Sequence, residues 1–483
     1  MSSAATRFGR RLSPSERWFW IIDRMSPSNC CGRVRVHGRI AADRLAVAAA
    51  ALIAEYPLLR MAVVDNSGRD PWLMPLDSPH IPVRQVTAAH SEAWIGEMNA
   101  ELARPFDTRE GLARIVDIVS AAGTEDEFHD VVLTISHIVV DGRSLMAVLR
   151  KLVTHAGGNA NHLVVERDSI PAADDLIPPA ARGVWRYLYT NLFDQAAAIV
   201  MRPRRFDVRN PAAIPVRQTR IVHRVLDREA LAELVSDCRR AGVTVHAAMT
   251  AAVARALGEV SDPGSAGVAG IGSPVDFRNL LRPLPDRDEL GIYAPVLVGF
   301  VRFGPAVPLW SAARSLKRQL DRGVRQRRHL STVAGMRFGT PRALESGRRL
   351  AEMVDRRAPW NVSVTNLGRV EFPAEIGAWR FSGLLLAASN SCVSVMTVAI
   401  TTAHDEMHLG FCHLDRIVPE RQAREFADAV LTALRERPEP SPEPVLQQAA
   451  QRRPIGLPGA SRDGDFVDHH DVVGHRGNID QVR

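Results

Sequence analysis

A histidine, an aspartate and a glycine at fixed spacing follow a strongly apolar segment of this 483-residue chain. His137 comes directly after the β-branched run Val131–Ser136, and Asp141 and Gly142 follow it closely. The run predicts a buried strand that carries the imidazole at its end. The glycine permits a close backbone approach or a positive φ. An imidazole held there is neutral near pH 7 and can take a proton from a hydroxyl, amine or thiol, so the segment predicts a general base.

The elements expected around this base alternate between helix and strand. Ser13 and Glu16 form a capping box that predicts a helix starting near Pro14. After Gly142, Ser144 is a candidate cap for a helix with one apolar face. Interspersed helices and strands predict an α+β (mixed α/β) architecture. Further expected elements are strands at 32–36 and 220–225 and helices at 41–55, 228–240 and 244–260.

The spacing His137-x-x-x-Asp141-Gly142 resembles the motif of the acyltransferase superfamily with the chloramphenicol acetyltransferase fold. That superfamily includes nonribosomal peptide condensation domains, and the chain is most similar to the phthiocerol/phthiodiolone dimycocerosyl transferase and alcohol acetyltransferase types. Four further landmarks occur in family order, and together they cover roughly residues 8–435. They are Arg11–Glu16, Glu55–Arg60, Pro274–Arg278 and Val362–Gly368.

The resemblance implies two similar halves, each a mixed sheet with helices, and an active-site channel between them. We expect an N-terminal half at 8–180, a crossover linker at 181–215, a C-terminal half at 216–435 and a disordered tail at 436–483. Four prolines at 438–444 and few apolar residues beyond them support the expected tail. The apolar stretch 184–201 is expected to pack on the core. The cluster Asp468–Asp471 is more simply an incidental part of the tail than a metal site, and we expect no metal.

The resemblance also implies roles for individual residues. His137 is the catalytic base, while Asp141 pairs with Arg278 and holds the loop shape with Gly142. The alternative is a triad in which Asp141 orients His137. Condensation domains usually carry a second histidine where this chain has Ser136, which favours ester over amide formation.

Two sets of residues allow both a functional and a plain structural interpretation. Ser363, Thr365 and Asn366 are possible oxyanion or substrate contacts, or else a polar strand face followed by a turn. Arg314, Arg318 and Arg322 recur at helical spacing, as a solvated face or as a docking site for the acyl donor or its carrier protein.

Composition narrows the class of protein. The net charge of +7 is small for this length and no nucleic-acid motif is visible, so we expect no nucleic-acid partner. No apolar run is long enough to span a membrane, and no secretion signal is visible. The five cysteines match no zinc spacing and fit a reduced, cytoplasmic setting. A monomer is sufficient for the expected two-half architecture.

The sequence therefore predicts an acyltransferase that forms esters without a covalent acyl-enzyme. The donor is an acyl thioester on coenzyme A or on the phosphopantetheinyl carrier protein of a polyketide or peptide synthase, and the acceptor is an alcohol. No tightly bound cofactor is expected. The alternatives are condensation-type amide formation with an amine and a non-catalytic module that docks carrier proteins.

Overall fold

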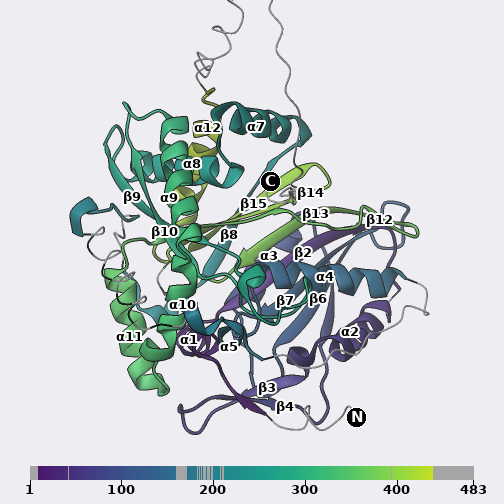
Figure 1. Ribbon diagram of the computed structural model, residues 1–483. Helices are drawn as coiled ribbons and strands as arrows, with labels where there is room; N and C mark the ends of the chain where they lie inside the picture. Colours follow the sequence, from purple (N-terminus) through teal and green to yellow (C-terminus); the bar gives the residue numbers. More distant parts are fainter. Residues whose placement is uncertain are drawn as a thin grey trace, which may run out of the picture. The chain divides into compact units, whose positions relative to one another are not determined.

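The computed structural model describes residues 9–438, apart from 42, 159–170, 393 and scattered positions between 182 and 210. Two six-stranded mixed sheets organise this part of the chain (Figure 1). The N-terminal sheet has the order β12 (Glu375–Ile376), β13 (Trp379–Ala388), β2 (Asn29–His37), β7 (Phe128–Ser136), β6 (Ala113–Ser120) and β5 (Val83–Thr87). The C-terminal sheet has the order β10 (Val296–Phe303), β9 (Gly267–Pro274), β11 (Val362–Arg369), β14 (Met396–Ala403), β15 (Glu406–Leu414) and β8 (Thr219–Leu226).

Each sheet contains both parallel and antiparallel neighbours, which confirms the mixed α/β expectation. The β5–β6 pair is parallel, as are the pairs of β11 with β9 and β14, and the other pairs within the two sheets are antiparallel. A third, small sheet joins β1 (Arg10–Arg11), β4 (Trp72–Pro75) and β3 (Met61–Val64).

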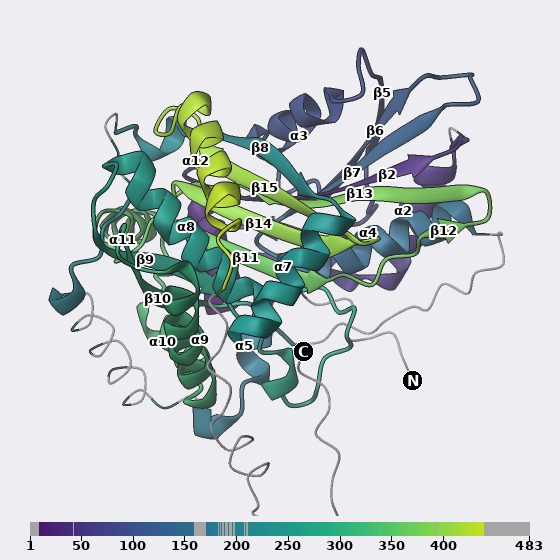
Figure 2. The same cartoon turned by 90° about the horizontal axis from the view of Figure 1, so that it is seen from above.

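Helices cover the sheets in layers. Those on the N-terminal sheet and beside it are α1 (Pro14–Asp23), α2 (Arg44–Glu55), α3 (Ala93–Ala103), α4 (Gly142–Gly157) and α5 (Ala173–Leu176). Those of the C-terminal part are α7 (Arg228–Ala241), α8 (Val245–Ser261), α9 (Leu309–Arg325), α10 (Arg328–Gly339), α11 (Leu344–Arg357) and α12 (Glu420–Ala433). Figure 2 shows α3 on one face of the N-terminal sheet and α2 and α4 on the other. Short 3-10 turns are η2 (Pro57–Arg60), η3 (Pro179–Ala181), η4 (Ile214–Val216) and η5 (Arg278–Leu280).

The C-terminal part of the chain contributes a hairpin to the N-terminal sheet. β12 and β13 come from the C-terminal part of the sequence, yet β13 pairs antiparallel with β2 along most of its length. The N-terminal sheet is therefore completed by residues that follow the expected boundary at 215–216. Figure 1 shows the light-green β13 beside the purple β2. Separating the halves would break this ladder, so they form one compact unit within residues 1–439.

Of the two helix caps that the sequence predicts, the first is present and the second is a different residue. Ser13 accepts the Glu16 N–H and Glu16 accepts the Ser13 N–H, which confirms the capping box. The expectation that Ser144 caps the next helix is wrong, because Asp141 is the N-cap residue of α4 and accepts the Ser144 N–H. Asp141 is the cap because its extended backbone directs its side chain at the free N–H groups of the first helical turn. Ser144 lies three positions inside the helix and supplies one of those N–H groups.

One expected buried segment is exposed. Trp185, Leu192, Ile199 and Val200 belong to the apolar stretch 184–201 and lie between 71% and 80% exposed. The expectation that this stretch packs on the core is wrong for these side chains. Of the expected tail at 436–483, residues 439–483 with the cluster Asp468–Asp471 lie outside the described residues. Within the described ranges, no helix combines the length and apolar character needed to cross a membrane.

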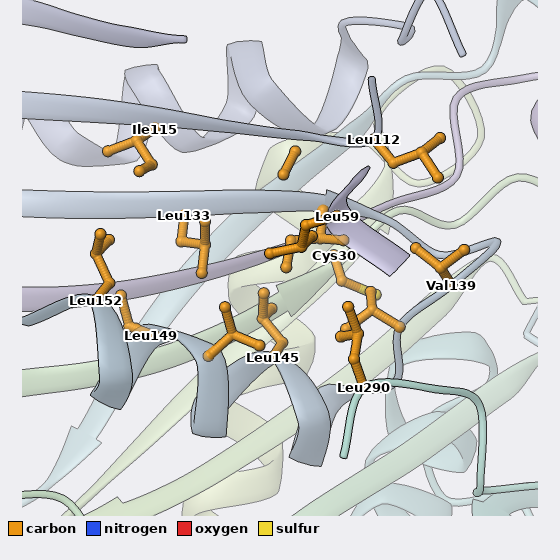
Figure 3. Packing of buried hydrophobic residues seen from close by; sticks show 14 of the residues in the cluster. Cys30, Leu59, Leu112, Ile115, Leu133, Val139, Leu145, Leu149, Leu152 and Leu290 are labelled. Atoms are coloured by element: carbon orange, nitrogen blue, oxygen red, sulfur yellow. The ribbon is translucent and has the colours of Figure 1, made fainter. Parts of the chain in front are cut away.

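A single apolar core surrounds the segment that carries His137. Val139 within the His137–Gly142 turn and Leu145 at the start of α4 point into this core together with Cys30 and Leu290 (Figure 3). All of them are nearly inaccessible to solvent. Leu290 belongs to the C-terminal part, so packing from both halves fixes the turn. Close packing of this kind leaves the backbone little freedom to move.

Candidate active site

His137 lies directly after β7, at the end of the strand that the apolar run predicts. Its backbone N–H donates to the Ser28 carbonyl over 2.8 Å, which ties it to the residue before β2. Its side-chain Nδ1 lies 2.7 Å from the Val140 carbonyl oxygen. Because a carbonyl oxygen only accepts, Nδ1 must carry the proton. The tight turn therefore selects the tautomer in which Nε2 holds the lone pair.

The environment also keeps this imidazole neutral. Burial lowers the pKa of His137 below its usual 6.5, and the hydrogen bond to Val140 and the charge of Asp141 only partly oppose this. The residue remains partly exposed, unlike its neighbours on both sides. A neutral, reachable imidazole with a free Nε2 lone pair has the protonation state that a general base requires.

This pKa direction sets the expected pH dependence of catalysis. Only neutral His137 accepts a proton, so kcat/KM should fall as the pH is lowered through the pKa of the free enzyme. Because that pKa is lowered from 6.5, the acid limb should have its midpoint below pH 6.5 and activity should be level near pH 7. A kcat/KM profile measured from pH 4.5 to 8.5 tests this, and a midpoint above 6.5 contradicts it.

Asp141 faces away from the imidazole and fastens the turn to the C-terminal half. Its Oδ1 accepts from the Ser144 N–H and hydroxyl and lies 3.2 Å from Arg278 Nη2. Its Oδ2 accepts the Tyr293 N–H over 2.9 Å. Its own N–H donates to the Gly291 carbonyl. The expected Asp141–Arg278 ion pair is thus present, and both carboxylate oxygens are occupied.

The triad alternative does not fit this geometry, because the oxygens that would orient His137 are bonded elsewhere. Burial alone would raise the pKa of Asp141, but the Arg278 charge and the bonds from Ser144 and Tyr293 outweigh burial and hold it below its usual value. Arg278 also pairs with Asp276 and lies with its guanidinium 4.0 Å from the Tyr293 ring centroid. Asp141 is therefore ionised and ties the turn after β7 to the C-terminal half.

Gly142 is required for space. Its φ lies outside the left-handed region. Of the two reasons expected for a glycine here, close backbone approach therefore applies and a positive φ does not. A Cβ at this position would lie 2.7 Å from Cδ2 of Leu386 on β13 and 3.4 Å from Cδ2 of Leu367 on β11. Two strands of the C-terminal part thus pack directly on the start of α4.

Gly142→Ala should therefore lower the free energy of unfolding by about 1–3 kcal/mol, since an added methyl overpacks a filled core. Gly96→Ala is a matched control in α3, where a Cβ meets no atom within 4 Å. That change should be neutral or raise stability by up to about 1 kcal/mol, as alanine favours helix. Urea unfolding of the three proteins measures the difference, and equal stabilities would contradict the packing argument.

The three polar residues of β11 behave differently from one another. Ser363 and Thr365 alternate with Val362 and Val364, whose side chains join the core under the C-terminal helices. They therefore point to the opposite face, as Leu367 does toward Gly142.

Ser363 shares a hydrogen bond of 2.7 Å with the Ser394 hydroxyl, whereas Asn366 accepts the Gly368 N–H and shapes the turn. No hydrogen bond joins any of the three to His137 in the part of the chain that the structure describes.

The three α9 arginines share one helix face. Arg314, Arg318 and Arg322 are all exposed on this helix, as their spacing predicts. Arg314 also lines a surface pocket of about 680 Å³ beside Trp310 and Phe303. Residues 309–357 contain thirteen Lys and Arg but only four Asp and Glu. This local excess exceeds the net charge of the whole chain, so positive charge is concentrated on the layer α9–α11.

Several contributors to the site carried no sequence signal. The Val140 carbonyl sets the tautomer through backbone geometry that no side chain encodes. Tyr293 and Gly291 reach Asp141 through main-chain atoms. Phe19 on α1 stacks on the imidazole, with ring centroids 3.9 Å apart and planes 21° apart. An aromatic residue in an amphipathic helix gives no sign of which side chain it will meet, so only the tertiary structure identifies this contact.

Part of the sequence is similar to a known protein family. Residues 215–413 match the model of the family described as phthiocerol/phthiodiolone dimycocerosyl transferase C-terminus. The C-terminal part of the chain is therefore similar to this acyltransferase family. No curated protein sequence matches the chain.

Solved structures share this fold at low sequence identity. Trichothecene 15-O-acetyltransferase of Fusarium sporotrichioides has a TM-score of 0.69 at 14% identity, over 90% of this chain and 97% of that one. Polyketide synthase associated protein 5 of Mycobacterium tuberculosis has a TM-score of 0.64 at 15% identity, over 88% and 98%. The condensation domain of the monacolin K polyketide synthase has a TM-score of 0.62 at 15% identity, over 88% and 96%.

Proposed function

We propose that this protein transfers an acyl group from a thioester to an alcohol, with His137 as the general base. The single observation that carries the proposal is the tautomer of His137. The Nδ1–H is committed to the Val140 carbonyl, which leaves the Nε2 lone pair available. An alcohol needs a base to attack a thioester at neutral pH, and a neutral imidazole with a lowered pKa supplies it.

The proposed reaction has two proton transfers and needs one base. Nε2 takes the hydroxyl proton as the alcohol oxygen bonds to the thioester carbonyl carbon. The carbonyl electrons move to oxygen, and hydrogen-bond donors stabilise the oxyanion. The hydroxyls of Ser363 and Thr365 are proposed donors, because they project from β11 on the face that packs against the His137 half. The oxyanion then collapses, the C–S bond breaks and the thiolate takes the proton from Nε2.

Amide formation is the second candidate, because condensation domains share this fold. An amine would use the same base in the same place. Ser136 stands where condensation domains usually carry another histidine, which favours the alcohol. The two candidates differ in acceptor alone.

An acceptor comparison tests the proposal directly. Purified protein is given a panel of acyl-CoA and acyl-pantetheine donors with matched long-chain alcohols and amines. Free thiol is followed and the products are weighed by mass spectrometry. Ester formation supports the proposal, and amide formation alone supports the second candidate. Binding of a carrier protein without transfer from any donor would indicate a non-catalytic docking module.

The donor is proposed to arrive on a carrier protein that docks on α9. Exposed Arg314, Arg318 and Arg322 form one face of that helix, within the basic layer α9–α11, and such a layer attracts an acidic protein. Phosphates of coenzyme A would meet the same charge, so both donors remain in the proposal.

Charge reversal tests whether a carrier protein docks on this face. Combined Arg314→Glu, Arg318→Glu and Arg322→Glu should raise KM for a carrier-bound donor by about tenfold or more, since rim charges act mainly on encounter. KM for acyl-pantetheine, which lacks a carrier, should not change. Arg421→Glu on α12, where the side chain is 90% exposed, is the matched control. A KM that rises equally for all donors would contradict docking on this face.

A further inference from the structure

The imidazole of His137 is held by a second contact that the proposed reaction does not yet use. The Phe19 ring lies against its face, with centroids 3.9 Å apart and an angle of 21° between the planes. The two residues are distant in sequence and come from α1 and from the turn after β7. Both rings are partly exposed, so the contact lies at the edge of the core and beside the reacting nitrogen.

The histidine lacks the carboxylate that usually orients and stabilises a catalytic imidazolium. Among the described residues, Asp141 is the charged side chain that acts on His137. Its oxygens are bonded to Ser144, Tyr293 and Arg278, and the guanidinium offsets its charge. The hydrogen bond from Nδ1 to Val140 holds the ring at one edge. The Phe19 ring lies against the ring face and so opposes a tilt of the imidazole plane about that bond.

Phe19 is itself held firmly by both halves. Arg17, two residues earlier on α1, donates to the carbonyls of Thr340 and Pro341 in the C-terminal part. Ile21, two residues later, packs against Gly347 on α11, where a Cβ would lie 2.6 Å from it. At the N-terminal end of α1, the hydroxyls of Ser13 and Ser15 donate to Asp174. These contacts hold α1 in place, so the Phe19 ring can hold the imidazole of His137 in turn.

We propose that Phe19 is a positioning residue for His137, which holds the imidazole plane and stabilises the imidazolium formed during acyl transfer. This inference rests on the proposed function. The face of a phenyl ring carries partial negative charge and attracts a cation placed over it. The contact therefore does part of what a carboxylate does in a triad, without a buried anion that would raise the resting pKa and leave the base protonated near neutral pH.

Three variants of α1 test the inference. Phe19→Leu keeps apolar bulk but removes the aromatic face. Phe19→Tyr keeps the ring and should behave as wild type. Trp18→Leu makes the same aromatic-to-leucine change at the neighbouring position, which has no ring contact with His137 among the described residues. Thermal unfolding of each variant checks that α1 remains packed.

The measurements are the His137 pKa in the resting protein, by NMR titration of the labelled imidazole, and kcat and KM across pH. Phe19→Leu should lower the His137 pKa by about half a unit and kcat by about tenfold or more with little change in KM. Phe19→Tyr and Trp18→Leu should leave both values near wild type.

The outcomes are separable from those of the proposed function, because the titration needs no turnover. A His137 pKa that is unchanged in folded Phe19→Leu overturns the inference, whatever happens to kcat. A loss of kcat shared equally by Trp18→Leu also overturns it, since that pattern reports general damage to α1. A lowered pKa in a protein that transfers no acyl group from any donor would uphold the contact while the proposed reaction fails.

Discussion

His137→Ala is expected to lower kcat for acyl transfer by about 10²- to 10⁴-fold, the usual contribution of a positioned general base. The expectation follows from the tautomer, since Nε2 of His137 keeps its lone pair while both oxygens of Asp141 are bonded elsewhere. Initial rates of thiol release with a saturating donor measure the effect.

The matched control is His80→Ala, at an exposed position in the loop before β5. It should leave kcat unchanged, and circular dichroism should show both variants folded. Added imidazole should partly restore turnover to His137→Ala, because a small free base can enter the space left by the side chain. Full activity in folded His137→Ala would mean that the base lies elsewhere and that the mechanism is wrong.

Asp141→Ala is expected to cost about 3–5 kcal/mol of unfolding free energy and most of the activity. The substitution removes the more deeply buried of the two carboxylates that pair with Arg278 and leaves only Asp276, which is 29% exposed. Removing one partner of a buried ion pair is strongly destabilising. It also removes the N-cap of α4 and the acceptor of the Tyr293 N–H. Urea unfolding and kcat, measured on the same preparations, quantify both losses.

A double substitution provides the control. Asp141→Leu combined with Arg278→Met removes both charges, so its cost should be smaller than the sum of the single costs. Strictly additive costs would show that the pair does not interact.

The pH dependence of stability has a definite sign for this pair. The folded pKa of Asp141 lies below its ordinary value of 3.8, so the unfolded state binds the proton more readily. Its contribution is complete above about pH 4 and is lost as the pH falls through the folded pKa. Wild type should therefore lose more stability between pH 4 and pH 2 than the Asp141→Leu, Arg278→Met variant.

The sequence by itself determined the elements that deliver the base. The β-branched run before His137 predicts β7, because such side chains suit a pleated and buried strand. The capping box at Ser13 and Glu16 predicts the start of α1, because its hydrogen bonds lie within four residues. The order of the landmarks also implied the superfamily, which the family match over 215–413 supports. These features are local, so neighbours in sequence are enough to specify them.

Only the tertiary structure decided how the site is assembled. Ser144 looked like a helix cap, and the backbone of the turn made Asp141 the cap instead. The stretch 184–201 was expected to pack on the core, yet Trp185 and Val200 are exposed. Apolar composition does not reveal whether another part of the protein is free to pack against a given segment. The hairpin β12–β13 joins the sheet of the other half through backbone bonds that carry no side-chain signature.

The same limit applies to the imidazole itself. Its tautomer depends on the Val140 carbonyl, and its orientation depends on Phe19, which is 118 positions earlier in the chain. The sequence could name the histidine because the chemistry of the side chain is its own. What the histidine does depends on which atoms the fold brings within a few ångströms of its ring, and contacts between distant residues arise only when the whole core packs.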